Sequence, residues 1–405
     1  MVSQKDIESF LHFGYYLDYE NPYYSIDISN INKDIYNNLS LEELIKIGKE
    51  NLMKSIDRLF TPNHKHVVPI SGGLDSRTIL AALLEFTEAS NISTYTFGTP
   101  GTLDYEIGTN LARSLGTNHI SFPLTEYTYS IDELFDISKR LDYQTVLFHH
   151  PPIWRIDELF QGFKFWSGFL GDRLTGSHYN KNFPKEVDKA KKLFIKMYRY
   201  QSNINLTNKK DDYFFDNLQF KKTGLSTFES LDFINRQLKF IAPHVLIRGY
   251  DYRLPFLDKD LINFFLSIPN EYRENQLLYK KMLLSTFPKL FEYPVKNNHG
   301  LKLTSSKISI FLSRVSNRLK RTIFGINKNI NYLDFDIKIR EKEDLKKIVY
   351  DSINDLYNRR LINWLDIRKL FKDHIDKKGN YGNALILLTS LEIHMKVKEI
   401  SKKKE

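Results

Sequence analysis

The stretch VVPISGGLDSRTILAALL, residues 67–84, decides the fold. A β-branched run over 67–70 predicts a short strand, and the apolar residues after the glycines recur with helical spacing, which predicts a helix over 76–88. Pro69 cannot donate a hydrogen bond to a neighbouring strand, so it fits only near the C-terminal end of the predicted strand. The stretch therefore predicts a strand that turns at Gly72 and Gly73 directly into a helix.

The same rhythm of strand, turn and helix repeats along the following hundred residues. It predicts strands at 93–97, 119–122 and 164–166 and helices at 104–115 and 131–140, with Gly116 ending the first of these helices. A capping-box pattern at Ser40 and Glu43 opens a further helix over 41–60. Such alternation predicts the α/β class, a parallel sheet covered by helices, with a largely helical part beyond about residue 180.

The glycine turn has the chemistry of an anion site. Gly72 and Gly73 let the backbone N–H groups approach a ligand closely, and the start of the following helix favours negative charge. Ser71 and Ser76 can donate further hydrogen bonds. Asp75 fits an anion site only if it holds a cation, and the Mg²⁺ that accompanies a nucleotide is the natural one. The loop therefore predicts a site for a magnesium-bound nucleotide.

Composition restricts the remaining possibilities. The chain has 405 residues, a net charge of +10 and no cysteine, which excludes disulfides and cysteine nucleophiles within it. The basic residues are scattered, so nucleic acid is not an expected partner. No apolar run is long enough to span a membrane, and the first residues lack the pattern of a signal peptide, so we expect a cytoplasmic protein without membrane contact.

Five segments, in order along the chain, resemble the asparagine synthetase family. They are ISGGLDS (70–76), TYTFGTPGTLDYEIGTNLARSLGTNHI (94–120), WSGFLGDRLTG (166–176), DYRLPFLDKDLINFFLSIP (251–269) and YKKMLLSTFP (279–288). The resemblance implies the PP-loop fold of adenine nucleotide alpha hydrolase-like proteins over residues 61–300. Residues 1–60 are then a lead-in segment and helix, and residues 301–405 are a helical extension packed on the synthetase domain.

The resemblance also implies a reaction and the residues that perform it. Enzymes of this family adenylate a carboxylate with ATP, release pyrophosphate and let ammonia attack the acyl-adenylate. Adenosine would be held by Ile70, Phe97, Gly98, Ser167 and Gly168. Pyrophosphate would lie in the loop formed by Ser71, Gly72, Gly73, Leu74, Asp75 and Ser76. Asp75 and Asp172 would bind Mg²⁺, and Lys281 would reach the phosphates.

Two departures from the family pattern limit how far the family's reaction and residue roles apply to this chain. Glutamine-dependent members begin with a glutaminase domain whose nucleophile is a cysteine, so this chain is expected to use ammonia, another amine or a separate glutaminase subunit. Phe169 stands where the family has a glutamate, and a phenyl ring can neither accept a proton nor orient an amine. Arg173 is a fixed cation that either meets an anionic substrate or forms a surface ion pair.

Three hypotheses follow. The first is an AMP-forming amide ligase acting on aspartate or on another small or sugar acid. The second is a degenerate nucleotide-binding protein without amide chemistry, and the third is a PP-loop enzyme that modifies tRNA. Steeply salt-dependent binding of tRNA would favour the third.

Overall fold

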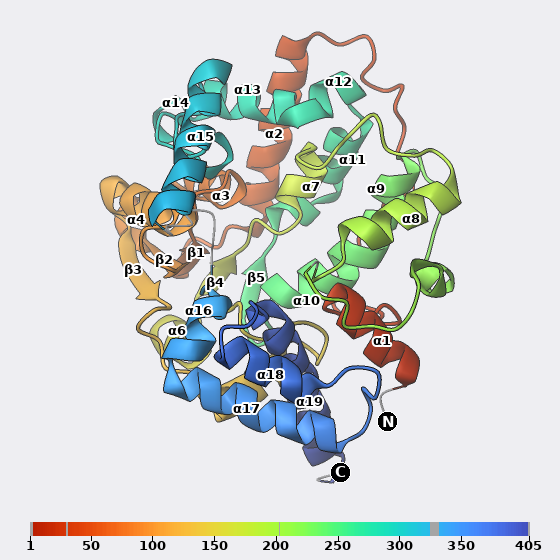
Figure 1. Cartoon of the computed structure of the whole chain (residues 1–405). Helices are drawn as coiled ribbons and strands as arrows, with labels where there is room; N and C mark the ends of the chain where they lie inside the picture. The colour runs from red at the N-terminus through yellow and green to blue at the C-terminus, as the bar shows by residue number, and fades with distance from the viewer. Residues whose placement is uncertain (1–2, 30, 202, 325–331, 404–405) are drawn as a thin grey trace.

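Parallel strands form the centre of the computed structural model, which describes residues 3–29, 31–201, 203–324 and 332–403 (Figure 1). The sheet has the order β3-β2-β1-β4-β5, and every neighbouring pair is parallel. The strands are β1 (His66–Pro69), β2 (Ile92–Gly98), β3 (Asn118–Pro123), β4 (Lys164–Trp166) and β5 (Asp251–Arg253). The strand order reverses between β1 and β4, and ligands of open α/β sheets bind at such a switch point.

The predicted α/β class is confirmed, and the predicted strands lie within a residue or two of their observed bounds. Pro69 is the last residue of β1, where ladder pairing ends, and the N–H of Ile70 donates to the carbonyl of Tyr95 at 2.8 Å. The fifth strand, β5, was not predicted, because it is short, carries charged residues at both ends and follows a long helical segment. The largely helical character predicted beyond about residue 180 is confirmed, and β5 is a three-residue strand within this helical part.

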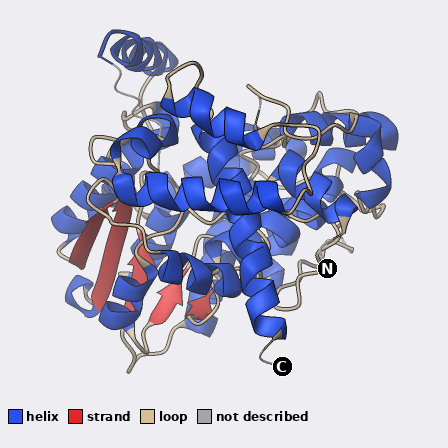
Figure 2. Ribbon diagram, turned by 60° about the horizontal axis from the view of Figure 1, so that its bottom comes forward, coloured by secondary structure: helices blue, strands red, loops and turns tan. Residues whose placement is uncertain are grey.

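Helices cover both faces of the sheet, as Figure 2 shows from below. Side chains alternate between the faces of a strand, so Val67 and Val68 in β1 belong to different hydrophobic clusters. Val68 packs with residues of α3 (Asp75–Leu83) and α4 (Leu103–Leu115), whereas Val67 packs with residues of α6 (Ile153–Phe160). The two layers hold the C-terminal ends of β1 and β2 in fixed positions beside the start of α3.

The helix predicted over 41–60 is α2 (Leu41–Leu59), and its capping box forms as expected between Ser40 and Glu43. This helix packs against α11 (Lys259–Ser267) and α13 (Leu277–Thr286), and Gly48 allows the close approach. A Cβ atom at Gly48 would stand 2.8 Å from the ring of Phe264 and 2.9 Å from the sulfur of Met282. The packing of α2 thus holds α13 beside the sheet.

An unpredicted helix, α1 (Gln4–Phe13), joins the N-terminal segment to the C-terminal helices. Ile7, Phe10 and Leu11 share a hydrophobic cluster with residues of α5 (Ile131–Arg140), α17 (Glu343–Asn358) and α19 (Gly382–Lys402). Figure 1 shows α1 in red beside the blue α19. The predicted divisions near residues 60 and 300 stay predictions, although both ends of the chain contribute to this one cluster.

The remaining helices fall into two groups. Between β4 and β5 lie α7 (Gly171–Thr175), α8 (Val187–Met197), η2 (Asp211–Asn217), α9 (Thr227–Asp232), the π-helix η3 (Phe233–Ile241) and α10 (Ala242–Val245). After β5 come η4 (Pro255–Leu257), α12 (Asn270–Arg273), η5 (Glu274–Gln276), α14 (Pro288–Phe291), η6 (Lys296–Asn298), α15 (Lys307–Phe324), α16 (Phe335–Glu341) and α18 (Ile367–Ile375). A short turn, η1 (Ala89–Asn91), precedes β2.

Candidate active site

A cavity of about 740 Å³ opens at the C-terminal ends of β1, β2 and β4. Most of the predicted site residues line it, and they come from segments almost a hundred residues apart in the sequence. These residues are Ile70, Ser71, Gly73, Leu74, Asp75, Ser76, Phe97, Ser167, Gly168 and Asp172. Gly72 and Gly98 do not line the cavity, although their sequence neighbours Ser71, Gly73 and Phe97 do. The fold therefore brings together the glycine loop and the segment after β4, as the resemblance implied.

The glycine loop forms a nest ahead of α3. The N–H of Gly73 donates to Ser71 Oγ at 3.3 Å, and the hydroxyls of Ser71 and Ser76 are 3.4 Å apart. Leu74, at the N-cap of α3, has no side-chain group that could accept from the first N–H groups of the helix. The positive end of α3 is therefore open toward the cavity, as an anion site requires.

Two glycines after β4 let that segment close on the loop. A Cβ atom at Gly168 would lie 2.8 Å from the Cβ of Asp75, and one at Gly171 would lie 2.5 Å from its Cγ. Between them Leu170 has a φ of 76°, a left-handed conformation that is uncommon for a leucine and that frequently marks a functional site. The spacing Gly-Phe-Leu-Gly-Asp thus places Asp172 beside Asp75.

Asp75 and Asp172 form a pair of carboxylates at the mouth of the loop. Burial, together with the negative charge of Asp172, raises the pKa of Asp75 well above its usual range. The hydroxyl of Tyr279 in α13 donates to Asp75 Oδ1 at 3.1 Å. A carboxylate destabilised by a like charge gains most from a bound cation, and carboxylate oxygens are the ligands that Mg²⁺ prefers. The residues present therefore fit a magnesium ion shared with a phosphate ligand.

The lysine of the site is Lys296. Its backbone N–H donates to the carbonyl of Gly72 at 2.9 Å, and its ammonium group forms an ion pair with Asp104. Asp104 in turn accepts from the N–H of Gly72 at 3.2 Å. Lys281, the lysine predicted from the resemblance, is exposed on α13 and does not line the cavity. The turn-rich sequence PVKNNHG around Lys296 is the signal that could have identified a lysine held in a loop.

The far end of the cavity is built by the π-helix η3. Arg236, Gln237 and Ile241 line the cavity from this helix, and π-helical turns occur frequently at functional sites. The guanidinium of Arg236 lies 4.5 Å from the ring centre of Tyr198 and 5.5 Å from that of Phe240. Sequence reasoning missed this helix, because no propensity distinguishes a π-helix from an α-helix.

Arg173 is buried, so the alternative of a surface ion pair is wrong. Its guanidinium forms an ion pair with the buried Asp232 and donates to the hydroxyl of Tyr198 at 2.7 Å. Burial alone would raise the pKa of Asp232, but the charge of Arg173 outweighs it and lowers that pKa. Phe169 also lies in the cavity wall, so the position that holds a glutamate in the family is apolar here, and Arg173 and Arg236 line the same cavity.

Histidines and a tyrosine form the remaining wall. The ring of Tyr332 stacks on His149 with the ring centres 4.3 Å apart and lies near Phe97. Burial lowers the pKa of His149 to about 4 and that of His150 to about 3. These imidazoles are therefore neutral near pH 7, and this wall adds no positive charge.

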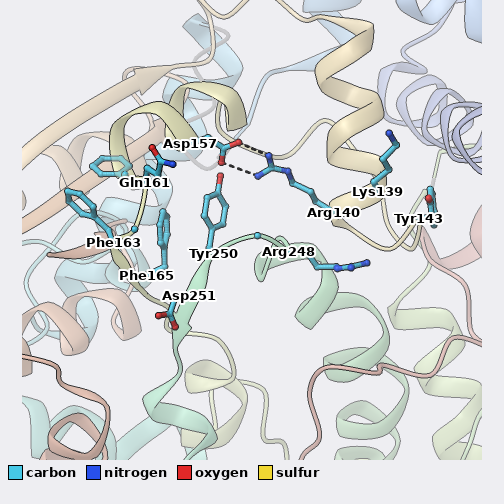
Figure 3. A pocket seen from close by; sticks show the side chains of 13 residues that line it. Lys139, Arg140, Tyr143, Asp157, Gln161, Phe163, Phe165, Arg248, Tyr250 and Asp251 are labelled. Carbon is cyan, nitrogen blue, oxygen red and sulfur yellow. Dashed lines mark hydrogen bonds and ion pairs between the residues drawn. The ribbon is translucent and has the colours of Figure 1, made fainter. Parts of the chain in front are cut away.

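A second hollow of about 850 Å³ lies at the opposite ends of the strands (Figure 3). Gly162 and Gly249, which line it, precede β4 and β5. Arg140 in this hollow donates to both oxygens of Asp157, at 3.0 and 2.6 Å. The arginine is thus held by a carboxylate, and ligands of parallel sheets bind at the other end of the strands. The candidate active site is therefore the cavity at the glycine loop.

Comparison with known proteins gives one family match, which includes the glycine loop. Residues 49–156 match the model of the asparagine synthase family, a stretch that contains β1 to β3, the glycine loop and Asp104. The sequence matches no curated protein significantly. Within the described residues, no helix is both long and apolar enough to cross a membrane. The family consists of ATP-dependent amide ligases. Residues 49–156 are therefore similar to the synthetase domain of the asparagine synthase family.

Proposed function

We propose that the protein is an ATP- and Mg²⁺-dependent, AMP-forming amide ligase. One observation carries the proposal: the open N-terminus of α3, the carboxylates of Asp75 and Asp172, and Lys296 all meet in one cavity. Phosphoryl chemistry needs N–H donors, a divalent cation and a positive side chain around the same phosphates.

Each part of the site has a separate task in this proposal. The loop from Ser71 to Ser76 and the start of α3 hold the pyrophosphate portion of ATP. Asp75 and Asp172 hold Mg²⁺, which neutralises charge on the phosphates when it is bound. Lys296 contacts the phosphates from η6, and its partner Asp104 keeps its position fixed through the N–H of Gly72.

The reaction would proceed in two displacements. A carboxylate oxygen of the substrate attacks the α-phosphorus of ATP, and the bond to the β-phosphate oxygen breaks, so pyrophosphate leaves. Ammonia or an amine then attacks the acyl carbon, AMP leaves and the nitrogen loses a proton. Because the sequence contains no cysteine, the nitrogen would come from free ammonia, an amine or a separate glutaminase subunit.

The charge at the far end of the cavity supports a substrate with a second negative group. Arg173 is balanced by Asp232, whereas Arg236 stacks on aromatic rings and adds positive charge there. Aspartate and small sugar acids that carry a second anionic group fit this end. Because Phe169 replaces the family glutamate, the part of the substrate beside it should be a group that does not pair with a carboxylate.

Pyrophosphate release tests the proposal. Purified protein receives ATP, Mg²⁺, ammonium and a panel of carboxylates that includes aspartate and sugar acids. We expect release with at least one acid, and loss of about a hundredfold or more in Asp75→Asn and Asp172→Asn variants. Asp260→Asn, which removes an exposed carboxylate on α11, is the matched control and should retain activity.

The loss of the family glutamate at Phe169 favours one second candidate, a protein that binds nucleotide without forming an amide. It predicts ATP binding that depends on Asp75 and Mg²⁺, with no pyrophosphate released for any acid in the panel. Calorimetric titration of ATP, made beside the release assay, separates the two candidates.

A further inference from the structure

Helix α15 (Lys307–Phe324) turns its apolar face toward solvent. Among the side chains of residues 307–319, five large apolar ones are exposed: Ile308 (74%), Phe311 (63%), Leu312 (60%), Val315 (39%) and Leu319 (53%). They follow the spacing i, i+3, i+4, i+7 and i+11, which places them in one stripe along the helix. In Figure 2 this helix stands clear of the body at the upper left.

The opposite side of α15 contacts the protein through Ser313 and Asn317, with Ile310 half-buried beside them. The hydroxyl of Ser313 and the side-chain amide of Asn317 both donate to the carbonyl of His299, at 2.9 and 3.2 Å. An amphipathic helix of a globular protein normally buries its apolar stripe and exposes its polar side. Here the orientation is reversed, so the stripe is available to something outside this chain.

The charge of this region is strongly one-sided. The sequence of α15 contains five lysines and arginines and no aspartate or glutamate, and no acidic residue occurs anywhere between 293 and 333. Lys307 and Arg314 are exposed and lie beside the apolar stripe. An apolar stripe flanked by cations is typical of helices that lie in the interface of anionic membranes.

We propose that α15 is an interfacial helix that docks the protein on an anionic lipid surface. The stripe enters the boundary between headgroups and acyl chains, while Lys307 and Arg314 meet the lipid phosphates. Two copies of α15 packed face to face would bring like charges together, so charge complementarity favours lipid over a second copy of this chain. Such a helix lies on the surface of a membrane and does not cross it. It therefore needs only an apolar stripe, whereas a transmembrane helix needs a long run of apolar residues.

Sedimentation with vesicles tests this proposal on the full-length protein. Vesicles of phosphatidylcholine alone are compared with vesicles that contain about 30% phosphatidylglycerol. We expect binding to the anionic vesicles, weakened at least several-fold by about 0.5 M NaCl because salt screens the cations. The double variant Phe311→Ser/Leu312→Ser should weaken binding about tenfold or more, since the stripe supplies the apolar contact.

Tyr350→Ser is the matched control, because Tyr350 is an exposed apolar side chain on α17, away from the stripe. It should bind vesicles as the parent protein does. Circular dichroism of the double variant checks that it remains folded. The proposal is overturned if the parent protein binds neither kind of vesicle, or if the double variant binds as well as the parent. It is equally overturned if the parent forms a dimer that the double variant abolishes while neither binds lipid.

Discussion

The hydroxyl of Tyr279 joins α3 to α13 by bonding both Thr78 Oγ1, at 2.8 Å, and Asp75 Oδ1, at 3.1 Å. Tyr279 is completely buried, so this hydroxyl fixes the direction of the carboxylate that holds a cation in the proposed function. In this structure α13 serves the site through Tyr279, whereas Lys281 points to solvent.

Tyr279→Phe should weaken the site without unfolding the protein. Loss of a buried hydrogen bond costs about 1 kcal/mol of unfolding free energy, and Asp75 loses the donor that orients it. We expect the KM for Mg²⁺-ATP to rise about threefold to tenfold. Tyr350→Phe on the surface of α17 controls for the substitution. An unchanged KM would show that the Tyr279 hydroxyl does not orient Asp75.

Replacing each of the two lysines by alanine distinguishes Lys281, the lysine implied by the family resemblance, from Lys296, the lysine that lines the cavity. Lys296→Ala should reduce kcat for pyrophosphate release by about a hundredfold or more, because it removes a cation from the developing charge. Lys281→Ala should leave kcat within about twofold, because an exposed group far from the reacting atoms contributes little. A larger loss of kcat in Lys281→Ala than in Lys296→Ala would assign the catalytic role to Lys281 instead.

Arg236→Gln should change the choice of substrate. The variant keeps a polar, hydrogen-bonding side chain but loses the charge and the far end of the guanidinium, so an acid with a second anionic group should show a KM about tenfold higher. The KM for ATP should stay the same. Arg155→Gln, on the exposed side of α6, is the matched control. If the KM values for ATP and for the acid rose together, Arg236 would serve the site as a whole and not the acid.

Removing Asp232 should destabilise the fold strongly. Asp232→Ala leaves the buried guanidinium of Arg173 without its carboxylate, and breaking a buried pair in this way costs about 3–5 kcal/mol. Urea unfolding measures the change. Glu158→Ala breaks the exposed pair with Arg155 and should have a small effect. Equal effects of the two substitutions would mean that water reaches Arg173.

Acid should destabilise the protein through buried histidines such as His394. Burial lowers the pKa of His394 to about 3, and its ring is bonded to Ser138 and to the carbonyl of Thr145, both at 2.7 Å. The pKa of His394 in the folded protein lies below its value of about 6.5 in the unfolded chain. The stability that depends on the neutral imidazole is therefore fully present above about pH 6.5. It is lost as the pH falls from there toward 3, at about 1.4 kcal/mol per pH unit.

The variant His394→Gln tests whether protonation of His394 lowers the unfolding free energy as the pH falls. Between pH 8 and pH 5 its unfolding free energy should fall less steeply than that of the parent protein, although the variant is less stable at pH 8 because the packing and hydrogen bonds of the ring change. Parallel curves for the two proteins would show that His394 is protonated equally in the folded and unfolded states.

Much of the fold could be predicted because its signals are local. The strand before Gly72, the helix after it and the stop at Gly116 each depend on neighbouring residues. What escaped prediction depends on distant partners. Arg173 is buried because Asp232, 59 residues later, neutralises it, and no local pattern shows that pairing.

Dependence on distant parts of the chain also explains why neither the place of Lys296 in the cavity nor the exposed apolar stripe of α15 could be predicted. Lys296 reaches the site because its loop bonds Gly72, more than two hundred residues earlier in the chain, whereas the helix that carries Lys281 only resembles the family segment. The apolar spacing of α15 would ordinarily indicate a buried face. Only the structure shows that the side with Ser313 and Asn317 is the one that contacts the protein.

The products formed from ATP test the central claim most directly. Phosphorus NMR of a reaction with ATP, Mg²⁺, ammonium and the accepted acid shows which phosphate bond breaks. The account predicts AMP and pyrophosphate in equal amounts, formed only when the acid is present and absent with Asp75→Asn. Formation of ADP and orthophosphate would contradict it, because the glycine loop and the Asp75–Asp172 pair are assigned to cleavage between the α- and β-phosphates.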